Sequence, residues 1–357
     1  MSNTAVTTHG VMEGAGSYNQ YAQLPAAGAS LALPFLEQAT LDVALEAGDH
    51  PIVVADYGSS QGKNSLVPMQ TAIKGLRKRV GPERPILVVH IDQPANDFNT
   101  LFDVLHRDPE RYSLGDPNVF PSAIGRSFYE SVFPKEHVHL AWSSYAALWL
   151  SRIPMRIPNH FVVLASSGAV REAFELQAAE DWKLFLSLRA RELHPGGRLI
   201  VVLPALNDEG LAGAGFEGLF ANANDALAEM VDDGVITGED RSRMVLGTVP
   251  RRRSHLLAPF DSDHQFCGLT AECCELFELP DAAWIDYERH GNLEELLNRH
   301  TGFFRAIFVP SLATALADPE KPRTFADELQ RRLKRKLAER PTPLHSFVQT
   351  MVLAKQR

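Results

Sequence analysis

The sequence contains few cysteines and no obvious metal-binding pattern. Its 357 residues include three cysteines, Cys267, Cys273 and Cys274, and their spacing matches no set of metal ligands. The thirteen histidines include no HExxH pair. So few cysteines are typical of a chain without disulfides in a reducing compartment. We therefore expect a cytoplasmic protein that holds no metal.

The sequence also lacks an excess of positive charge and long apolar runs. The net charge is −9, whereas a nucleic-acid partner would require a basic surface. The first residues show no basic region followed by an apolar run, so no secretory signal is expected. No apolar stretch approaches the length that spans a membrane. We therefore expect neither a nucleic acid nor a membrane as partner.

One basic cluster, residues 331–336, stands out against this acidic background. It interrupts a row of apolar residues at helical spacing, namely Phe325, Leu329, Leu333 and Leu337. This spacing predicts an amphipathic helix whose solvated face carries the basic residues, with Thr324 as its N-cap.

A complete phosphate-binding loop is missing as well. The stretch "VVADYGSSQGKNS", residues 53–65, contains Gly62 and Lys63, but Tyr57 and Asn64 stand where the P-loop requires Gly and Ser or Thr. A carboxylate at Asp56 would repel a phosphate. A second glycine pattern, 213–218, formally matches GxGxxG, yet it lies too far beyond its strand. We interpret it as a flexible entry to a cap.

The first 204 residues alternate between short apolar runs and amphipathic stretches. Strands are predicted at 52–55, 84–92, 138–142, 160–165 and 199–204, and helices at 66–80 and 171–194. Strands alternating with helices through short glycine turns are typical of a doubly wound, mostly parallel Rossmann-like sheet. We therefore predict an α/β fold.

The pattern changes after Pro204, and we predict three parts. Residues 30–204 form the core, with residues 1–29 as a lid. Residues 205–258 form an inserted helical cap. Residues 259–357 return to the sheet: we expect strands in "AAWIDYERHG" and "HSFVQTMVLAKQR", and further cap helices around 290–340.

Two acids end the first two predicted strands, Asp56 and Asp92. Ligands of doubly wound sheets bind outside the carboxyl ends of the strands. A carboxylate after the second strand can accept hydrogen bonds from both hydroxyl groups of a ribose, and an acid beside the glycine loop suits a cationic ligand. A positively charged nucleoside without phosphates fits, which makes S-adenosylmethionine the candidate cofactor. The alternative is that each aspartate only caps the following helix.

Four long motifs occur in order and resemble a known family. They are "ADYGSSQGKNS", "IDQPANDFNTLF", "GRSFYESVFP" and "SSYAALWLSRIP". Together they look like the successive motifs of the SABATH carboxyl methyltransferases, which methylate salicylate, benzoate and jasmonate. The resemblance is dense in the N-terminal half, continues through "PGGRLIVVLP", and implies a methyltransferase sheet with a helical cap.

The resemblance also implies roles for individual residues. The cofactor would be held by Ser17, Tyr18, Asp56, Gly58, Asn64, Asp92, Gln93, Ser127 and Phe128. The substrate pocket would contain Gln23, Tyr145, Leu148 and Trp149. The Trp149 indole and the Gln23 amide would position the substrate carboxylate. "GSYNQYAQ" resembles the family's "SYxxNSxxQ" with two residues missing, and keeping the Asn-to-Gln spacing selects Gln23.

Plainer readings remain open for these residues. Tyr145 and Trp149 have helical i, i+4 spacing and could form a core pair. Phe128 could likewise belong to the core, and Gln23 could be a surface residue.

The implied reaction needs no catalytic base. A carboxylic acid with a pKa of about 4–5 is already ionised at neutral pH, so in-line methyl transfer requires positioning. Leu148 stands where family members commonly place His or Met, and an aliphatic residue suits an alkyl chain. Bacterial relatives in this family methylate fatty acids, so the resemblance implies a medium-chain fatty acid as substrate. Alternative substrates are a small aromatic acid (benzoate, salicylate, indole-acetate) or a purine. Alternative functions are a nucleotide-dependent oxidoreductase or a non-catalytic cofactor-binding protein. A homodimer is expected as well, by analogy with the plant relatives of the family, which pair into dimers.

Overall fold

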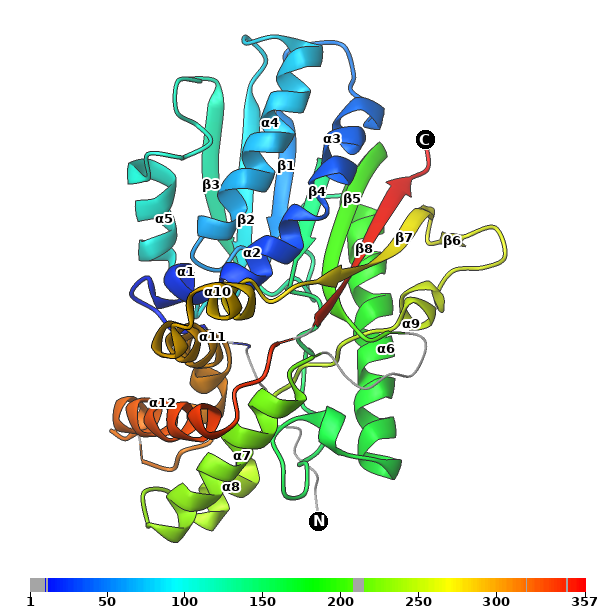
Figure 1. Ribbon diagram of the computed structural model, residues 1–357. Helices are drawn as coiled ribbons and strands as arrows, with labels where there is room; N and C mark the ends of the chain where they lie inside the picture. Colours follow the sequence, from blue (N-terminus) through cyan, green and yellow to red (C-terminus); the bar gives the residue numbers. More distant parts are fainter. Residues whose placement is uncertain (1–9, 11, 208–214, 319, 345) are drawn as a thin grey trace.

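The computed structural model describes residue 10 and residues 12–207, 215–318, 320–344 and 346–357. Its centre is a mixed sheet in the order β3-β2-β1-β4-β5-β8-β7-β6 (Figure 1). The strands are β1 (Ile52–Tyr57), β2 (Ile86–Asp92), β3 (Val119–Gly125), β4 (Val138–Ser144), β5 (Leu193–Ala205), β6 (Gln265–Phe266), β7 (Leu269–Leu279) and β8 (Ser346–Lys355). The pairs among β1 to β5 are parallel, whereas β8, β7 and β6 pair antiparallel. The predicted α/β fold with a mostly parallel sheet is confirmed.

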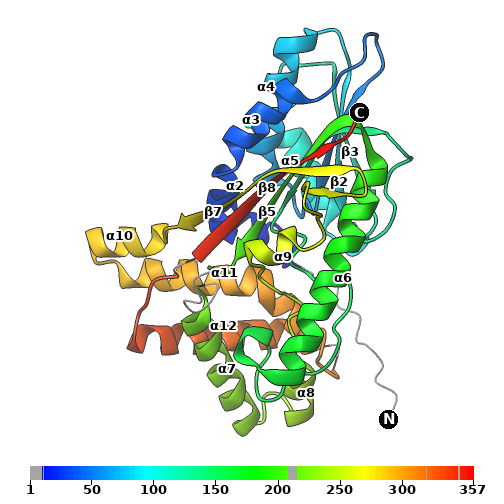
Figure 2. The same ribbon diagram turned by 90° about the vertical axis from the view of Figure 1, so that its right-hand side faces the viewer.

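Helices cover both faces of the parallel part of the sheet, which explains why its strands are mostly apolar. On one face, Ile52 and Val54 of β1 pack with α3 (Leu33–Asp42), α4 (Leu66–Val80) and α5 (Phe98–Arg107). On the other face, Val53 and Ala55 pack with α6 (Gly168–Glu192) (Figure 2). Successive side chains of a strand point to opposite faces, so one short run serves both cores.

The C-terminal strand was predicted from its sequence and is confirmed. β8 lies between β5 and β7, with Ile200 opposite Val352 in the β5 pairing. The return strand expected at 282–291 is wrong, since this segment forms α10 (Ala282–His290). Asp281 caps α10 by accepting hydrogen bonds from the N–H groups of Ala283 and Trp284. The chain returns to the sheet earlier, through β7.

The strand expected at 160–165 is also absent. Val163–Ala165 is a 3-10 turn, and no sheet strand includes this segment. The apolar character of the run has another cause, because Val162 and Leu164 line a cavity. A wall of apolar side chains can thus resemble a buried strand in the sequence.

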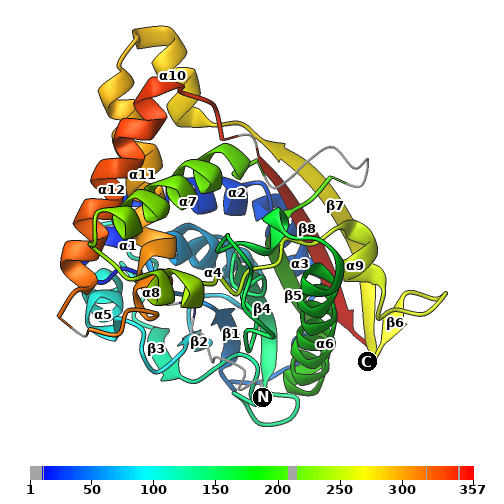
Figure 3. The ribbon, with the colours of Figure 1, turned by 90° about the horizontal axis from the view of Figure 1, so that it is seen from below.

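A cap of helices stands at the carboxyl ends of the parallel strands (Figures 1 and 3). Its helices are α7 (Glu217–Asp232), α8 (Gly238–Arg243), α9 (Arg253–Leu257), α11 (Leu293–Ala313) and α12 (Pro322–Glu339). α12 packs against α7 and α11, so the segment after the return to the sheet joins the segment inserted after β5. In Figure 3, α7 and α8 lie in front of the strands, with α11 and α12 beside them. Gly213 and Ala214 of the second glycine pattern lie outside the described residues.

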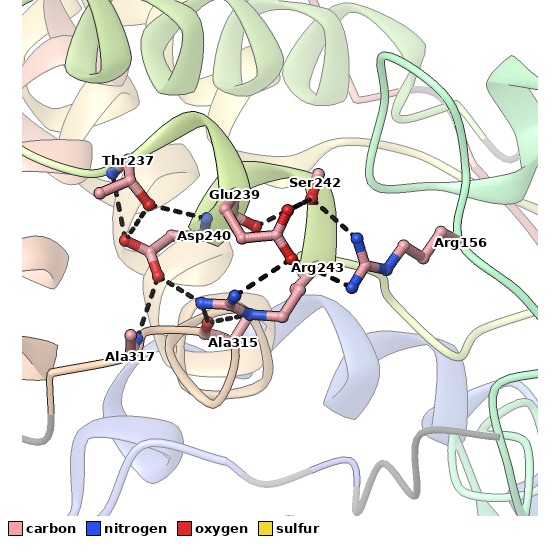
Figure 4. Close-up of polar contacts among 8 residues, drawn as sticks. All are labelled: Arg156, Thr237, Glu239, Asp240, Ser242, Arg243, Ala315 and Ala317. Carbon is pink, nitrogen blue, oxygen red and sulfur yellow. Dashed lines mark hydrogen bonds and ion pairs between the residues drawn. The ribbon is translucent and has the colours of Figure 1, made fainter. Parts of the chain in front are cut away.

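Polar contacts fasten α8 to the end of α11 (Figure 4). The Arg243 guanidinium donates to the Ala315 carbonyl (2.9 Å), and the Ala317 N–H donates to the Asp240 carboxylate (3.0 Å). Asp240 also completes a capping box with Thr237. These bonds connect the two separate cap segments of the chain.

The predicted amphipathic helix corresponds to α12. The four residues of its apolar row are all buried. The helix begins at Pro322 with Lys321 as its N-cap residue, so the expectation that Thr324 caps it is wrong. Pro fits the first turn because its missing N–H would have no partner there. The basic face is engaged in ion pairs, such as Arg332 with Asp233 (2.7 Å).

Within the described residues, no helix combines the length and the apolar character needed to cross a membrane. The same residues contain no cluster of three His, Cys, Asp or Glu side chains able to hold a metal ion.

Candidate functional site

A cavity of about 350 Å³ lies at the carboxyl ends of the parallel strands. Segments that follow β1, β2, β3 and β4 supply its walls, as expected for a doubly wound sheet. Six of the nine residues expected to hold a cofactor line it: Tyr18, Gly58, Asp92, Gln93, Ser127 and Phe128. Tyr145 and Trp149, expected in the substrate pocket, line it as well.

Asp92 ends β2 and is fixed by the neighbouring backbone. Its carboxylate accepts hydrogen bonds from the N–H groups of Ser60 and Gln93, each at 2.8 Å. Burial raises the pKa of the Asp92 carboxyl to about 6, although these two hydrogen bonds act in the opposite direction. Ionising this group within the cavity is therefore costly, and a ligand that donates hydrogen bonds to it would favour the charged form.

The glycine loop after β1 needs its glycines. Gly58 has φ of 89°, and a Cβ at this position would overlap the Cβ of Ala146. The loop also holds three buried polar atoms without a hydrogen-bond partner among the described residues: Ser59 Oγ, Ser60 Oγ and Gln61 Oε1. Ser60 itself lines the cavity. Buried polar atoms are nearly always paired, so this loop fits a polar ligand that would complete its hydrogen bonds.

Residues 58–62 also have the spacing of the GxSxG motif of serine hydrolases. Ser60 has φ of 47°, as a strained nucleophile turn would. A nucleophilic serine requires a base hydrogen-bonded to its hydroxyl, and Ser60 Oγ has no partner in the described structure. The geometry therefore gives no support to a serine hydrolase.

Three residues expected to hold the cofactor do not line this cavity. The buried Asp56 carboxylate is engaged by the Ser65 hydroxyl (2.5 Å) and by His90 Nδ1 (3.0 Å). Ser17 donates its hydroxyl to Glu13 Oε2 (2.5 Å). The Asn64 amide donates to the Ala22 carbonyl (3.1 Å). These side chains anchor the loop and the N-terminal helices around the cavity.

A second cavity, of about 60 Å³, continues from the first. Met12, Tyr18, Tyr145 and Trp149 line both, so these side chains stand where the two spaces meet. Leu148 lines the second cavity beside mostly apolar residues. They come from α2 (Gln23–Ser30), the segment before α6, the end of β5 and the cap region: Leu24, Pro25, Val162, Leu164, Pro204, Phe216, Phe220, Thr248, Pro250, Phe303, Ile307 and Phe308. The cap phenylalanines were not predicted as site residues, because their motif-free helices gave no signal beyond apolar spacing.

Trp149 is held firmly in the turn after β4. Its backbone carbonyl accepts a hydrogen bond from the Tyr129 hydroxyl (2.6 Å), and its N–H donates to the Ala146 carbonyl (3.0 Å). Gly10 packs on the indole ring so closely that a Cβ there would lie 2.8 Å from Trp149 Cδ2. The indole N–H has no hydrogen-bond partner in the described part of the chain. It is a donor ready for a ligand at the junction of the two cavities.

Two half-buried tyrosines, Tyr18 and Tyr145, stand at the same junction. Burial raises the pKa of the Tyr18 hydroxyl far above its ordinary value, and the nearby carboxylates of Asp92 and Asp56 raise it further. Burial likewise raises the pKa of the Tyr145 hydroxyl. Both phenols therefore stay neutral at physiological pH and can donate hydrogen bonds.

The structure does not bring Gln23 to the substrate cavity. Gln23 is exposed at the start of α2 and lines a separate, third cavity, whereas Leu24 and Pro25 line the second. Counting the family's SYxxNSxxQ pattern from Ser17 without a gap places Pro25, not Gln23, at the glutamine position. Proline has no side-chain donor, so α2 offers the second cavity no amide.

The N-terminal segment is tied across the site by Glu13. Its carboxylate pairs with Arg305 of α11 (2.8 Å), and its carbonyl accepts a hydrogen bond from the Gln61 amide of the glycine loop (2.6 Å). The Glu13 N–H donates to the Ala306 carbonyl (2.9 Å). One residue thus connects the cap, the glycine loop and the segment that carries Met12 and Tyr18.

Replacing Gly28 by alanine is expected to destabilise the protein by roughly 1–3 kcal/mol, the usual cost of overpacking a core. A Cβ at Gly28 would overlap the hydroxyl oxygen of Tyr145, so the ring would have to leave its position against α2. Urea denaturation measures the change. Gly238→Ala is the control, because nothing lies within 4 Å of the new methyl group. Equal stability of the two variants would contradict the close contact.

Comparisons with known proteins agree with this geometry. The family model described as SAM dependent carboxyl methyltransferase matches residues 4–356. Methyltransferase LUC1 of Fusarium sp is 32% identical over 243 residues, which are 67% of this chain and 63% of that protein. Salicylate carboxymethyltransferase of Clarkia breweri is 32% identical over 243 residues, which are 64% of this chain and 66% of that protein. The chain thus spans less than two thirds of the length of these curated relatives.

A solved structure titled loganic acid methyltransferase with SAH resembles the whole chain. Its TM-score is 0.77 at 22% sequence identity, and the match covers 97% of this chain and 99% of the other. At this identity the likeness concerns the fold. The motifs, the cavity and the family model, which spans nearly the entire sequence, lead to one conclusion. The chain belongs to the SAM dependent carboxyl methyltransferases, the SABATH family, with S-adenosylmethionine as its cofactor.

Proposed function

We propose that this protein converts a small carboxylic acid, most favourably a medium-chain fatty acid, to its methyl ester. One observation carries the proposal: the cavity lined by Asp92 shares Tyr145 and Trp149 with a second cavity, which has mostly apolar walls. A polar cofactor and an apolar acid can therefore meet at two aromatic side chains with free donors.

Six residues would hold the cofactor. Asp92 would accept the ribose hydroxyls, and Gln93, Ser127 and Phe128 would surround the adenine. Gly58 and Tyr18 would border the methionine end. When bound, S-adenosylmethionine supplies the methyl group as a sulfonium that readily gives it up.

The protein's own part is to place the substrate and exclude water. The acid arrives ionised, so no side chain has to remove a proton. The Trp149 indole N–H donates to the carboxylate and orients one oxygen, and the neutral hydroxyls of Tyr18 and Tyr145 stand at the same junction. None of these donors is charged, so the carboxylate keeps its negative charge and its nucleophilicity. The apolar walls keep the reacting groups poorly solvated.

The second cavity supports a fatty acid through its composition. Aliphatic side chains such as Leu148, Val162 and Ile307 line it, and each buried methylene of a ligand contributes about 0.8 kcal/mol. A small aromatic acid is the second candidate. It is favoured by phenylalanines that already pack with one another, such as Phe220 against Phe308 edge to face at 5.3 Å between ring centres.

Incubation with S-adenosylmethionine and a panel of fatty, aromatic and purine substrates tests the proposal by mass spectrometry. Methyl esters of medium-chain fatty acids are the expected product. Esters of aromatic acids alone would establish the second candidate, and methylated purine would redirect the assignment within the family. The absence of any methylated product would favour a non-catalytic cofactor-binding protein, and tightly bound nicotinamide would favour an oxidoreductase.

We also propose that the protein works in the cytoplasm as a homodimer. Each chain would be divided into three parts, at residues 30–204, 205–258 and 259–357. Light scattering of the purified protein measures its mass directly. A monomer at micromolar concentration would contradict the dimer.

Cofactor affinity should fall as the pH drops through about 6. The pKa of the Asp92 carboxyl is raised to about 6, and hydrogen bonds from ribose hydroxyls need the ionised form. Lowering the pH from 8 to 5 is therefore expected to weaken binding of S-adenosylhomocysteine roughly tenfold. Calorimetric titration at several pH values measures this. An Asp92→Asn variant should lose the dependence, and an unchanged pH profile in that variant would assign the effect to another group.

A further inference from the structure

A third cavity, of about 70 Å³, adjoins the second cavity, which we call the apolar cavity from here on. Leu24 and Phe303 line both, so these two side chains form part of the wall between them. They come from distant parts of the chain, Leu24 from α2 and Phe303 from α11. At this place the two cavities are therefore separated by the side chains of Leu24 and Phe303.

Phe303 is the more tightly held of the two. It is buried, and its ring stacks on Phe216 at 5.6 Å and meets Phe308 edge to face at 5.8 Å. Leu24 is half-buried near the N-terminus of α2, where it packs at the margin of the core. Shortening Leu24 therefore opens the wall with less disturbance than removing the Phe303 ring.

The third cavity can receive an uncharged chain end. Ala27, Ala283 and Leu344 contribute apolar atoms to its walls. Its charged groups are already paired: His300 Nε2 lies 2.8 Å from Asp281, and Arg299 lies 2.8 Å from Asp286. Because the side chains of Arg299 and His300 already have acidic partners, they do not draw a second carboxylate into this space.

We propose that Leu24 and Phe303 set the chain-length limit for the acid, and that the third cavity takes up additional methylenes when either side chain is shortened. The inference rests on the proposed function, since it requires that the acyl chain occupies the apolar cavity. Each methylene that gains a place in the third cavity should then raise kcat/KM roughly fourfold.

The test compares straight-chain acids of increasing length with the wild-type protein, Leu24→Ala and Phe303→Leu. Both variants should prefer longer acids than the wild type. Phe304→Leu is the matched control, because Phe304 is buried beside Phe303 on α11 but lines neither cavity, and its length preference should stay close to that of the wild type. Calorimetric binding of the acids in the presence of S-adenosylhomocysteine gives a readout that does not depend on turnover. Thermal unfolding identifies a variant that fails to fold.

A blocking variant makes the result decisive. Ala27 is exposed on α2 and lines the third cavity, so Ala27→Leu should fill that space with little cost to folding. Added to Leu24→Ala, it should restore the preference for shorter acids. If the wild type methylates medium-chain acids but folded Leu24→Ala keeps the same optimum, the inference fails alone. If the wild type methylates no fatty acid, the proposed function fails with it.

Discussion

Replacing Trp149 by phenylalanine is expected to lower kcat/KM for methyl transfer roughly ten- to a hundredfold. The variant keeps an aromatic ring against Gly10 but removes the indole N–H, which stands at the junction of the two cavities without a partner in the described structure. A hydrogen bond to a charged group contributes about 1.5–3 kcal/mol, which corresponds to this range of rates. Steady-state kinetics with the preferred acid measures the effect.

Cofactor binding should survive this change. Calorimetry with S-adenosylhomocysteine should give nearly the same affinity for Trp149→Phe and the wild type. Trp284→Phe is the control, since its indole N–H is engaged by Glu288 within α10 (2.8 Å), away from both cavities. A Trp149 variant that methylates as fast as this control would contradict the assigned role. Loss of cofactor binding instead would place Trp149 in the cofactor site.

Replacing Asp92 by asparagine is expected to weaken cofactor binding roughly a hundredfold or more. The carboxylate is the charged acceptor at the end of β2, and two ribose hydroxyls would each lose a bond worth about 1.5–3 kcal/mol. The new amide NH₂ would also face a backbone N–H, either that of Ser60 or that of Gln93. Calorimetric titration with S-adenosylhomocysteine measures the loss.

A surface substitution of the same kind separates charge from position. Asp103 is 63% exposed and pairs with Arg107 one helical turn away, so Asp103→Asn removes an equal charge at a remote site. Its cofactor affinity should match that of the wild type. Thermal unfolding of Asp92→Asn shows whether the glycine loop still folds around the altered side chain. Binding by folded Asp92→Asn within threefold of wild type would refute the ribose contact.

The sequence locates the part of the site that belongs to the parallel strands. Asp92, Ser127 and Tyr145 lie at the ends of β2, β3 and β4 or directly after them, where side chains converge at one edge of the sheet. β3 itself was not predicted, because its sequence contains a proline and no continuous apolar run. It is a half-buried strand at the edge of the sheet. The motif that carries Ser127 nevertheless marked the position.

The sequence could not locate what depends on packing between distant segments. Asp56 also lies beside the glycine loop, yet its carboxylate is hydrogen-bonded to the buried side chains of His90 and Ser65. Nothing in the local sequence pattern indicates these two bonds. Gln23 and Pro25 lie two positions apart on α2. The orientation of this helix places Pro25 in the wall of the second cavity and Gln23 in the wall of the third. The apolar start of α10 resembles a strand, and only the preceding N-cap residue, Asp281, indicates a helix.

The last strand in the sequence occupies an interior position in the sheet, and this orders the events of folding. β8 separates β5 from β7, so the hairpin of β6 and β7 has no template to join until residues 346–355 are available. From the completion of β5 until β8 emerges, a nascent chain must therefore carry an open edge at β5, a state prone to association. Closure of the whole sheet waits for the final ten-residue strand to leave the ribosome.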